Sequence, residues 1–228
     1  MRPTSPGSQA ARAATAPLLS RRLVCLGAAG LAGCSVLPKT PYVEQTQWPL
    51  IVKRPETLPR RPNGPVLAVR DVTPAPGLDQ RGLQWLLPNG SVHVDFYNQW
   101  AVPPAQAVTM DLQQWLAASG LFSGVVAVGS GLTPDLELDA TLSTFIADPR
   151  VLTAHAALAL VLIDAQAIPA KVLLQRTVSA DAHMTTDTPE GIVDALRAAL
   201  ADALRMTEAT LASLPAVRGG ATRIRSRR

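Results

Sequence analysis

Hydrophobic and polar residues follow a two-residue period in the second half of the chain, which predicts strands. Between Leu136 and Thr144 they alternate strictly, so one face of this strand is expected to be buried and the other to meet water or a partner. The apolar stretches Val151–Asp164 and Lys171–Ala180 predict two paired antiparallel strands, joined near residues 165–170. These three segments form the centre of a predicted sheet.

Two shorter strands and a helix are predicted upstream of this centre. Val66–Val72 and Ser91–Tyr97 are rich in valine and border turns that contain proline or glycine. After them, apolar residues recur at helical spacing from Pro103 to a stop at Gly120. This pattern indicates a helix that buries one face.

A long helix is predicted near the end of the chain. Thr188 is a good N-cap residue, and Pro189 suits the first turn of a helix. Ile192, Leu196, Leu200 and Leu204 then follow four residues apart, alongside Ala199 and Ala203. The resulting stripe is broad enough to cover a sheet.

The N-terminal region has a different pattern, typical of an export signal. Arg21 and Arg22 precede an apolar run, Leu23–Gly33, which ends at Cys34. This run is about half the length of a membrane-spanning helix, and a charged start, an apolar middle and a small-residue end are the parts of a secretory signal. Residues 1–33 are therefore predicted to be a signal peptide.

The end of this signal resembles the bacterial lipobox. Leu31, Ala32 and Gly33 directly precede Cys34, and small residues at these positions fit a lipoprotein signal peptidase. We therefore expect Cys34 to become the first residue of the exported protein and to carry covalent lipid, including palmitate. An uncleaved apolar helix and an ordinary signal peptide with an incidental cysteine remain as alternatives, and the choice between the general and the twin-arginine export routes stays open.

Charge separates the chain into regions and excludes one class of function. The 21 basic residues outnumber the 17 acidic ones, but four arginines belong to residues 1–33 and five to the part after Pro215. The body between residues 34 and 214 has 12 basic and 17 acidic residues. A nucleic-acid-binding protein needs basic groups spread over a folded face, so this function is excluded. Residues 215–228 are predicted to be a disordered basic tail, either solvated or in contact with anionic lipid head groups.

Proline divides the exported part into a tether and one domain. Seven prolines occur between residues 34 and 65: Pro38, Pro41, Pro49, Pro55, Pro59, Pro62 and Pro65. Because proline fixes the backbone and lacks a donor, residues 34–65 are predicted to be an extended tether with at most a short strand near residues 42–52. Residues 66–214 have the size of a single domain.

Motifs for catalysis or metal binding are not found in the sequence. The three histidines, His93, His155 and His183, are far apart, and none belongs to a metal-binding array. The glycine motif around Ser130 lacks the lysine of a phosphate-binding loop. Three alternating carboxylates, Asp135, Glu137 and Asp139, would suit either a solvated strand face or a cation or basic partner. The chain is therefore predicted not to be an enzyme, with no metal and no cofactor other than the lipid on Cys34.

Several segments together resemble the ABC-type transport auxiliary lipoprotein family. The most specific one is an aromatic-Trp-x-x-Pro pattern leading into the first helix, here Tyr97, Trp100 and Pro103. The helix end Leu116–Phe122 and the alternating strand Leu136–Phe145 also fit. The resemblance implies an α/β (α+β) fold: a two-layer sandwich of a mainly antiparallel sheet with two helices packed on one face.

The resemblance also implies a function in lipid transport. Such lipoproteins are thought to work at the periplasmic face of the outer membrane with an ATPase, a permease and an MCE lipid-binding subunit, and Ser35 after the cysteine favours that location. Tyr97, Trp100 and Pro103 are the first candidates for contact with the MCE subunit. An exposed sheet edge would allow a homo-oligomer. Two alternatives are a lipid carrier, with a slot beside the alanine face Ala195–Ala203, and a factor that assists outer-membrane barrel assembly.

Overall fold

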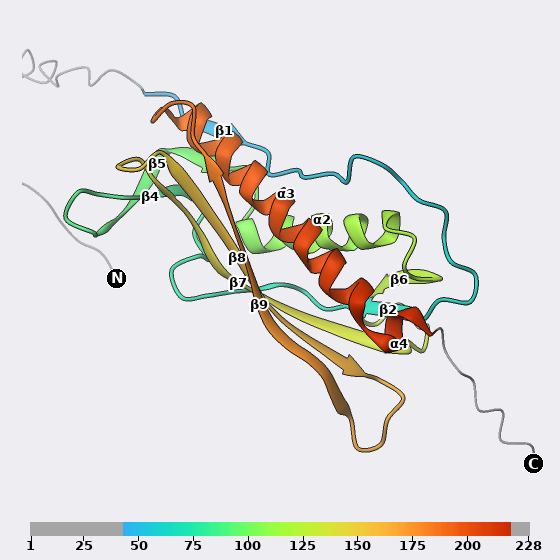
Figure 1. Ribbon diagram of the computed structural model, residues 1–228. Helices are drawn as coiled ribbons and strands as arrows, with labels where there is room; N and C mark the ends of the chain where they lie inside the picture. The colour runs from blue at the N-terminus through green and yellow to red at the C-terminus, as the bar shows by residue number, and fades with distance from the viewer. Residues whose placement is uncertain (1–42, 220–228) are drawn as a thin grey trace, which may run out of the picture. The chain divides into compact units, whose positions relative to one another are not determined.

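The computed structural model describes residues 43–219 (Figure 1). Its strands are β1 (Thr46–Trp48), β2 (Val66–Val69), β3 (Thr73–Pro74), β4 (Gly82–Leu86), β5 (Val92–Trp100), β6 (Gly124–Ala127), β7 (Leu136–Asp148), β8 (Thr153–Asp164) and β9 (Lys171–His183). Its helices are α2 (Pro104–Ala118), α3 (Pro189–Ser213) and α4 (Pro215–Arg218).

Three long strands form the body of the sheet. β7, β8 and β9 pair antiparallel over nearly their whole lengths. The other edge of β7 pairs in parallel with β2, β3 and β4 in turn. The sheet then extends from β2 to β6 and, at its other end, from β4 to β5 and β1. It is mainly antiparallel because the parallel pairings are short.

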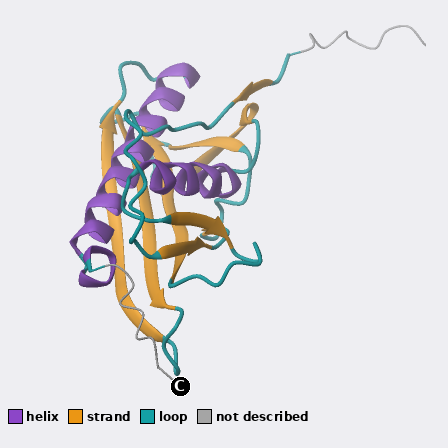
Figure 2. Ribbon diagram, turned by 90° about the vertical axis from the view of Figure 1, so that its right-hand side faces the viewer, coloured by secondary structure: helices purple, strands orange, loops and turns teal. Residues whose placement is uncertain are grey.

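Both long helices lie on the same face of this sheet (Figures 1 and 2). The alternation of β7 explains this arrangement, since Leu136, Leu138 and Leu142 are buried in the core while Glu137 and Asp139 are only partly buried. No helix in residues 43–219 covers the opposite face. The predicted fold class is confirmed.

The start of α3 follows the sequence signal. The Thr188 hydroxyl accepts a hydrogen bond from the Gly191 backbone N–H at 3.3 Å, and Pro189 occupies the first turn. The predicted stripe is buried against the sheet: Ile192, Leu196, Ala199, Leu200, Ala203 and Leu204 are each at most 2% exposed. Burial of these apolar side chains stabilises the two-layer packing.

The sequence located the long elements correctly and missed three short strands, β3, β4 and β6. β7 continues to Asp148, four residues beyond the strict alternation, because a bulge between Leu142 and Thr144 restarts the pairing with β8. β4 and β6 are five and four residues long. Hydrophobic and polar residues do not alternate clearly in either strand. Their place in the sheet therefore depends on packing against neighbouring strands rather than on a local pattern.

The folded unit begins earlier than the predicted boundary at residue 66. Val43–Pro65, which we call the strap, belongs to one compact unit with the rest of the described residues. Leu50 and Val52 are 4% and 5% exposed, and β1 pairs with the end of β5. Residues 43–65, more than two thirds of the expected tether, are therefore part of the domain, because these apolar side chains stabilise its contact with the core.

The predicted disordered tail also begins too early. Pro215–Arg218 form the helical turn α4, and Val217 is 1% exposed. The Arg61 side chain of the strap donates a hydrogen bond to the Val217 carbonyl at 3.0 Å. Burial of Val217 holds this turn to the domain, whereas residues 220–228 lie outside the described part of the chain.

Within residues 43–219, the helices do not reach the length and apolar character that a membrane crossing requires.

Candidate functional site

The predicted lipid site lies outside the described residues. Cys34 and its preceding lipobox residues Leu31, Ala32 and Gly33 all come before Val43. The first residues of the strap nevertheless show where the chain joins the domain. β1 pairs in parallel with the end of β5, from Thr46 opposite Asn98 to Trp48 opposite Trp100.

The family-like segment around Tyr97 forms an irregular bulge in β5. Val94 pairs with Gln84, but the next partner on β4, Gly82, pairs with Gln99. Four residues of β5, Asp95–Asn98, therefore lie opposite a single residue of β4. We call this segment the aromatic bulge; bulges of this kind re-aim side chains and often occur beside functional sites.

The Asp95 carboxylate holds the bulge in shape. It accepts hydrogen bonds from the backbone N–H groups of Tyr97 at 2.7 Å and Asn98 at 3.1 Å, and from the Asn98 side chain at 2.8 Å. Partial burial raises the pKa of Asp95, but these hydrogen bonds outweigh it and keep the pKa below its ordinary value. The bulge therefore stays intact at neutral pH.

Gly82 makes room for this backbone path. A Cβ atom at Gly82 would lie 2.5 Å from the Asp95 carbonyl oxygen and 2.6 Å from a Val94 methyl carbon. No other residue fits opposite the bulge without a backbone shift. The glycine and the aspartate together specify the bulge.

Two aromatic side chains are presented to solvent by the bulge. Phe96 is 66% exposed and Tyr97 is 46% exposed. Their rings meet edge to face, with centroids 5.4 Å apart. Val92 and Val94 on the same strand are also exposed, so this edge of the domain offers an apolar surface of the kind that partner proteins bind.

The other two predicted contact residues have different positions. Trp100 is 1% exposed and packs against Phe145, with ring centroids 5.6 Å apart. Its side chain is therefore a core residue and is not available to a partner. Pro103 is half-buried at the N-cap of α2, so of the three residues only Tyr97 is a prominent surface group.

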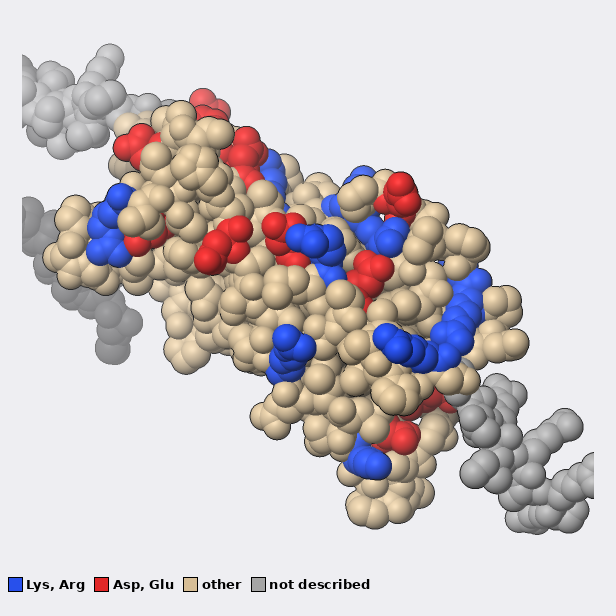
Figure 3. Space-filling view, in the orientation of Figure 1, with Lys and Arg blue, Asp and Glu red and all other residues tan. Residues whose placement is uncertain are grey.

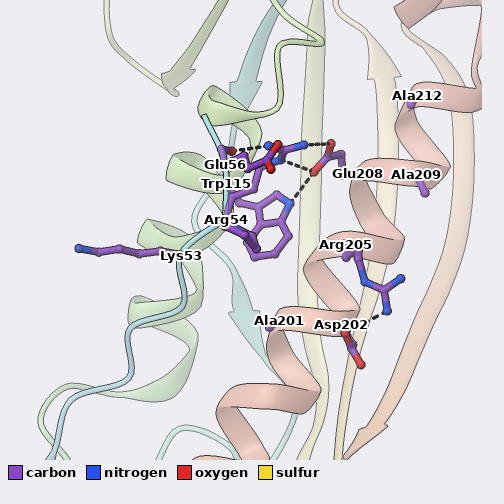
Figure 4. A pocket seen from close by; sticks show the side chains of 11 residues that line it. Lys53, Arg54, Glu56, Trp115, Ala201, Asp202, Arg205, Glu208, Ala209 and Ala212 are labelled. Carbon is purple, nitrogen blue, oxygen red and sulfur yellow. Dashed lines mark hydrogen bonds and ion pairs between the residues drawn. The ribbon is translucent and has the colours of Figure 1, made fainter. Parts of the chain in front are cut away.

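A second cluster fastens the strap to the helices (Figure 4). The Glu208 carboxylate of α3 pairs with both the Nε and Nη2 atoms of Arg54, at 3.0 and 3.2 Å, and accepts a hydrogen bond from the Trp115 indole N–H at 2.7 Å. One carboxylate thus joins the strap, α2 and α3. Because all three groups are mostly buried, these hydrogen bonds are stronger than a surface ion pair.

A buried carboxyl group also faces the strap. Asp111 of α2 is 3% exposed and accepts a hydrogen bond from the Val52 backbone N–H at 3.0 Å. Burial raises the pKa of Asp111 to about 6, although the hydrogen bond from Val52 acts in the opposite direction. The attachment of the strap is therefore sensitive to pH.

We predict that Asp111→Asn stabilises the domain at pH 7.5 but not at pH 4.5. The folded pKa of Asp111 is above the unfolded value of 3.8, so the folded state binds more protons and its stability falls as pH rises from about 4 to 6. Asparagine still accepts the Val52 hydrogen bond without this ionisation. Urea unfolding should show a gain of about 2–3 kcal/mol at pH 7.5.

The exposed Asp79→Asn variant is the control, because it changes the net charge equally without removing a buried carboxyl group. An equal gain in both variants would contradict a specific effect of Asp111.

The alternating carboxylates of β7 have partners within the domain. Arg70 bridges Glu137 at 2.9 Å and Asp139 at 3.2 Å. Asp135 accepts a hydrogen bond from the Val66 backbone N–H at 2.8 Å. In the described residues no group of three or more His, Cys, Asp or Glu side chains is placed to hold a metal ion. The structure therefore favours the interpretation as a strand face over a cation site.

The histidines lie apart in the fold. His93 stacks on Trp85 in the β4–β5 pair, with ring centroids 4.3 Å apart. His155 contacts Asp181 across β8 and β9, with Nδ1 2.7 Å from the carboxylate. His183 ends β9 and is exposed. His93 and His155 therefore lie on strands, as the sequence predicted.

The alanine face that the carrier hypothesis required is closed by packing. Ala195, Ala199 and Ala203 are 4%, 0% and 0% exposed between α3 and the sheet. Small residues here allow the helix to approach the strands closely, so the side chains fill the layer rather than line a slot.

Sequence reasoning missed the residues that shape both clusters. Asp95 had a recognisable signal, because an aspartate side chain often accepts a hydrogen bond from the backbone N–H two residues later and so forms a local turn. Phe96 was overlooked because the strand pattern gave no sign of a bulge. Glu208 and Asp111 contact residues 154 and 59 positions away, and no local pattern could have shown these partners.

The comparisons with known proteins agree with this fold. The family model for the ABC-type transport auxiliary lipoprotein component matches residues 50–206. The chain is similar to the solved structure of protein XCC0632 from Xanthomonas campestris, of the family DUF330, at 18% identity and a TM-score of 0.61, covering 76% of this chain and 98% of that one. It also matches a PelC dodecamer from Paraburkholderia phytofirmans at 13% identity and a TM-score of 0.40, covering 64% and 90%. No curated protein matches the sequence.

The matched region covers the second half of the strap, the whole sheet beyond it and most of α3. A family model with this coverage identifies the chain as an accessory component of a transport system. The chain belongs to the ABC-type transport auxiliary lipoprotein family. Membership associates it with a transporter and a membrane anchor, and indicates an accessory rather than a catalytic role.

Proposed function

We propose that this protein is a lipid-anchored component of an MCE-associated lipid transport system, and that it docks the transport assembly at the periplasmic face of the outer membrane. Lipid on Cys34 attaches the chain to the membrane, and Ser35 favours the outer one. The domain supplies a binding surface and no catalytic step. The ATPase, the permease and the lipid-binding MCE subunit are separate proteins.

The aromatic bulge is the observation that carries this proposal. Its two exposed rings are presented by a backbone that Asp95 and Gly82 specify. A rigid pair of exposed aromatic rings is characteristic of energetically dominant contacts in protein interfaces. The bulge also adjoins β1, so the docking surface lies beside the first strand of the domain, into which the proposed anchor segment leads.

We predict that the double variant Phe96→Ala/Tyr97→Ala loses most of its recovery of the MCE subunit. Aromatic interface residues often contribute 2 kcal/mol or more each, so at least a tenfold lower recovery is expected. The measurement is chemical cross-linking in intact envelopes, followed by purification of the tagged lipoprotein and quantification of the MCE subunit.

Ile168→Ala/Val172→Ala is the matched control. Both residues are exposed apolar groups, 98% and 55% exposed, at the β8–β9 hairpin, and Figure 1 shows this hairpin far from the bulge. Unchanged recovery with Phe96→Ala/Tyr97→Ala would contradict docking through the bulge. Failure to recover the MCE subunit with the unmodified protein would contradict the proposed partnership, and recovery of a barrel protein instead would favour a role in barrel assembly.

A further inference from the structure

The domain separates its charges into a basic face and an acidic remainder. Residues 43–219 contain twelve Lys and Arg residues and seventeen Asp and Glu residues. Half of the basic residues lie along the strap and the end of α3 and in α4; these residues, which we call the basic face, are Lys53, Arg54, Arg60, Arg61, Arg205 and Arg218. Three carboxylates lie among them: Glu56, Asp202, which pairs with Arg205 at 3.0 Å, and Glu208, which pairs with Arg54. The strap also carries Glu44 near its start. The remaining described residues carry six basic and fourteen acidic groups.

Contacts within the fold hold the basic face together. Arg61 donates to the carbonyl oxygens of Val217 and Arg218, and Arg218 donates to the Ala212 carbonyl at 2.8 Å. These acceptors are uncharged carbonyl oxygens, so the hydrogen bonds do not neutralise the charge of either guanidinium group. Arg54 is attached to Glu208. Figure 3 shows the Lys and Arg side chains gathered where the strap runs beside the C-terminal half of α3.

A shallow hollow lies within this face (Figure 4). It has a volume of about 460 Å³ and is lined by the Trp115 ring and by small side chains of α3, Ala201, Ala209 and Ala212. Lys53 and Arg205, both exposed, stand at its rim. Its charged lining is mixed, because Glu56, Asp202 and Glu208 also border it and Asp202 pairs with Arg205 at 3.0 Å. The hollow therefore offers apolar surface for the first lipid carbons, and the basic residues outside it supply the attraction to phosphates.

We propose that the basic face binds the anionic head-group surface of a phospholipid bilayer, so that the domain lies against the membrane that holds its lipid anchor. Gly219, the last described residue, directly follows Arg218 of this face. The nine residues after it include four arginines and no acidic residue: Arg223, Arg225, Arg227 and Arg228. Basic groups near an anionic membrane each strengthen binding several-fold, and their effects accumulate.

The length of chain before the domain allows this arrangement. This step depends on the proposed lipid anchor at Cys34. Eight residues, 35–42, lie between Cys34 and Val43, so the two ends can be about 30 Å apart in extended conformation. The 25 residues of α3 span about 38 Å. Because the segment between Cys34 and Val43 is no longer than the domain, it keeps the domain beside the bilayer, where the basic face meets the head groups.

Sedimentation with lipid vesicles tests this inference. The chain from residue 35 to 228 contains the whole compact unit and no lipid, so it reports the basic face independently of the anchor and of any protein partner. We expect it to sediment with phosphatidylethanolamine vesicles that contain one quarter phosphatidylglycerol, and not with phosphatidylcholine vesicles. Binding should fall strongly when salt is raised from 50 to 300 mM.

Two pairs of substitutions separate the basic face from general charge. Lys53→Gln/Arg60→Gln removes two exposed charges of the face and should weaken binding about thirtyfold. Lys171→Gln/Arg176→Gln removes two exposed charges on β9 and should leave binding within twofold. No sedimentation with anionic vesicles, or equal losses in the two pairs, would overturn the inference.

Discussion

Trp100→Ala is expected to destabilise the domain by about 3–5 kcal/mol. The indole is 1% exposed and packs on Phe145. The Trp100 backbone also donates to the Arg81 carbonyl at 2.7 Å, and its own carbonyl accepts from the Arg81 side chain at 2.8 Å. Removing the ring leaves a cavity where β5 joins the start of α2. Urea unfolding should show a lower midpoint with an unchanged slope.

Tyr97→Ala is the control for this result. Tyr97 is three residues away on the same strand but 46% exposed, so its loss should change the free energy of unfolding by less than about 1 kcal/mol. A loss of partner recovery in Trp100→Ala would therefore report damage to the fold, whereas the same loss in Phe96→Ala/Tyr97→Ala would report the surface. Equal stability of Trp100→Ala and the parent would contradict burial of the Trp100 indole in the core.

Cys34→Ala is expected to lose its covalent lipid and to remain an uncleaved precursor. Without the thiol, no diacylglyceryl group can be attached, and the lipoprotein signal peptidase has no lipid-modified cysteine before which to cut. In the parent, several acyl chains together give stable attachment, because each buried methylene contributes about 0.8 kcal/mol. Labelling with radioactive palmitate should be lost completely, and the variant should migrate on gels as the larger precursor.

Cys25→Ala provides the matched control. Cys25 lies in the apolar run that is predicted to be removed with the signal peptide, so its substitution should change neither labelling nor location. A Cys34→Ala protein that is processed, located and active like the parent would contradict lipid anchoring. The vesicle experiment with residues 35–228 would still report the basic face in that case, so the two ideas can fail separately.

The strap links the proposed anchor segment to β5, the strand that contains Trp100 and the aromatic bulge. It begins where the proposed anchor segment ends, and three kinds of contact fix it to the domain: the pairing of β1 with β5, the Val52 hydrogen bond to Asp111, and the pair between Arg54 and Glu208. The strap and the docking surface therefore belong to one compact unit, which begins at Val43.

The sequence by itself determined the long elements and the class of protein. The two-residue period of β7 and the four-residue spacing of apolar side chains in α3 are local patterns, and such patterns determine which face of an element is buried. Thr188 and Pro189 marked the start of α3 in the same way. The motif of Tyr97, Trp100 and Pro103, together with the helix end Leu116–Phe122, the alternating strand and the lipobox, identified the family.

Only the tertiary structure decided which of these residues reach the surface. Trp100 and Tyr97 belong to one motif, yet the bulge at Asp95 turns Tyr97 outward while Trp100 enters the core. The attachment of the strap through Glu208 and Asp111, and the basic face formed by residues from both ends of the domain, join positions up to 157 residues apart. Contacts at such separations depend on how the layers pack, and the local periodicity of a sequence contains no information about them.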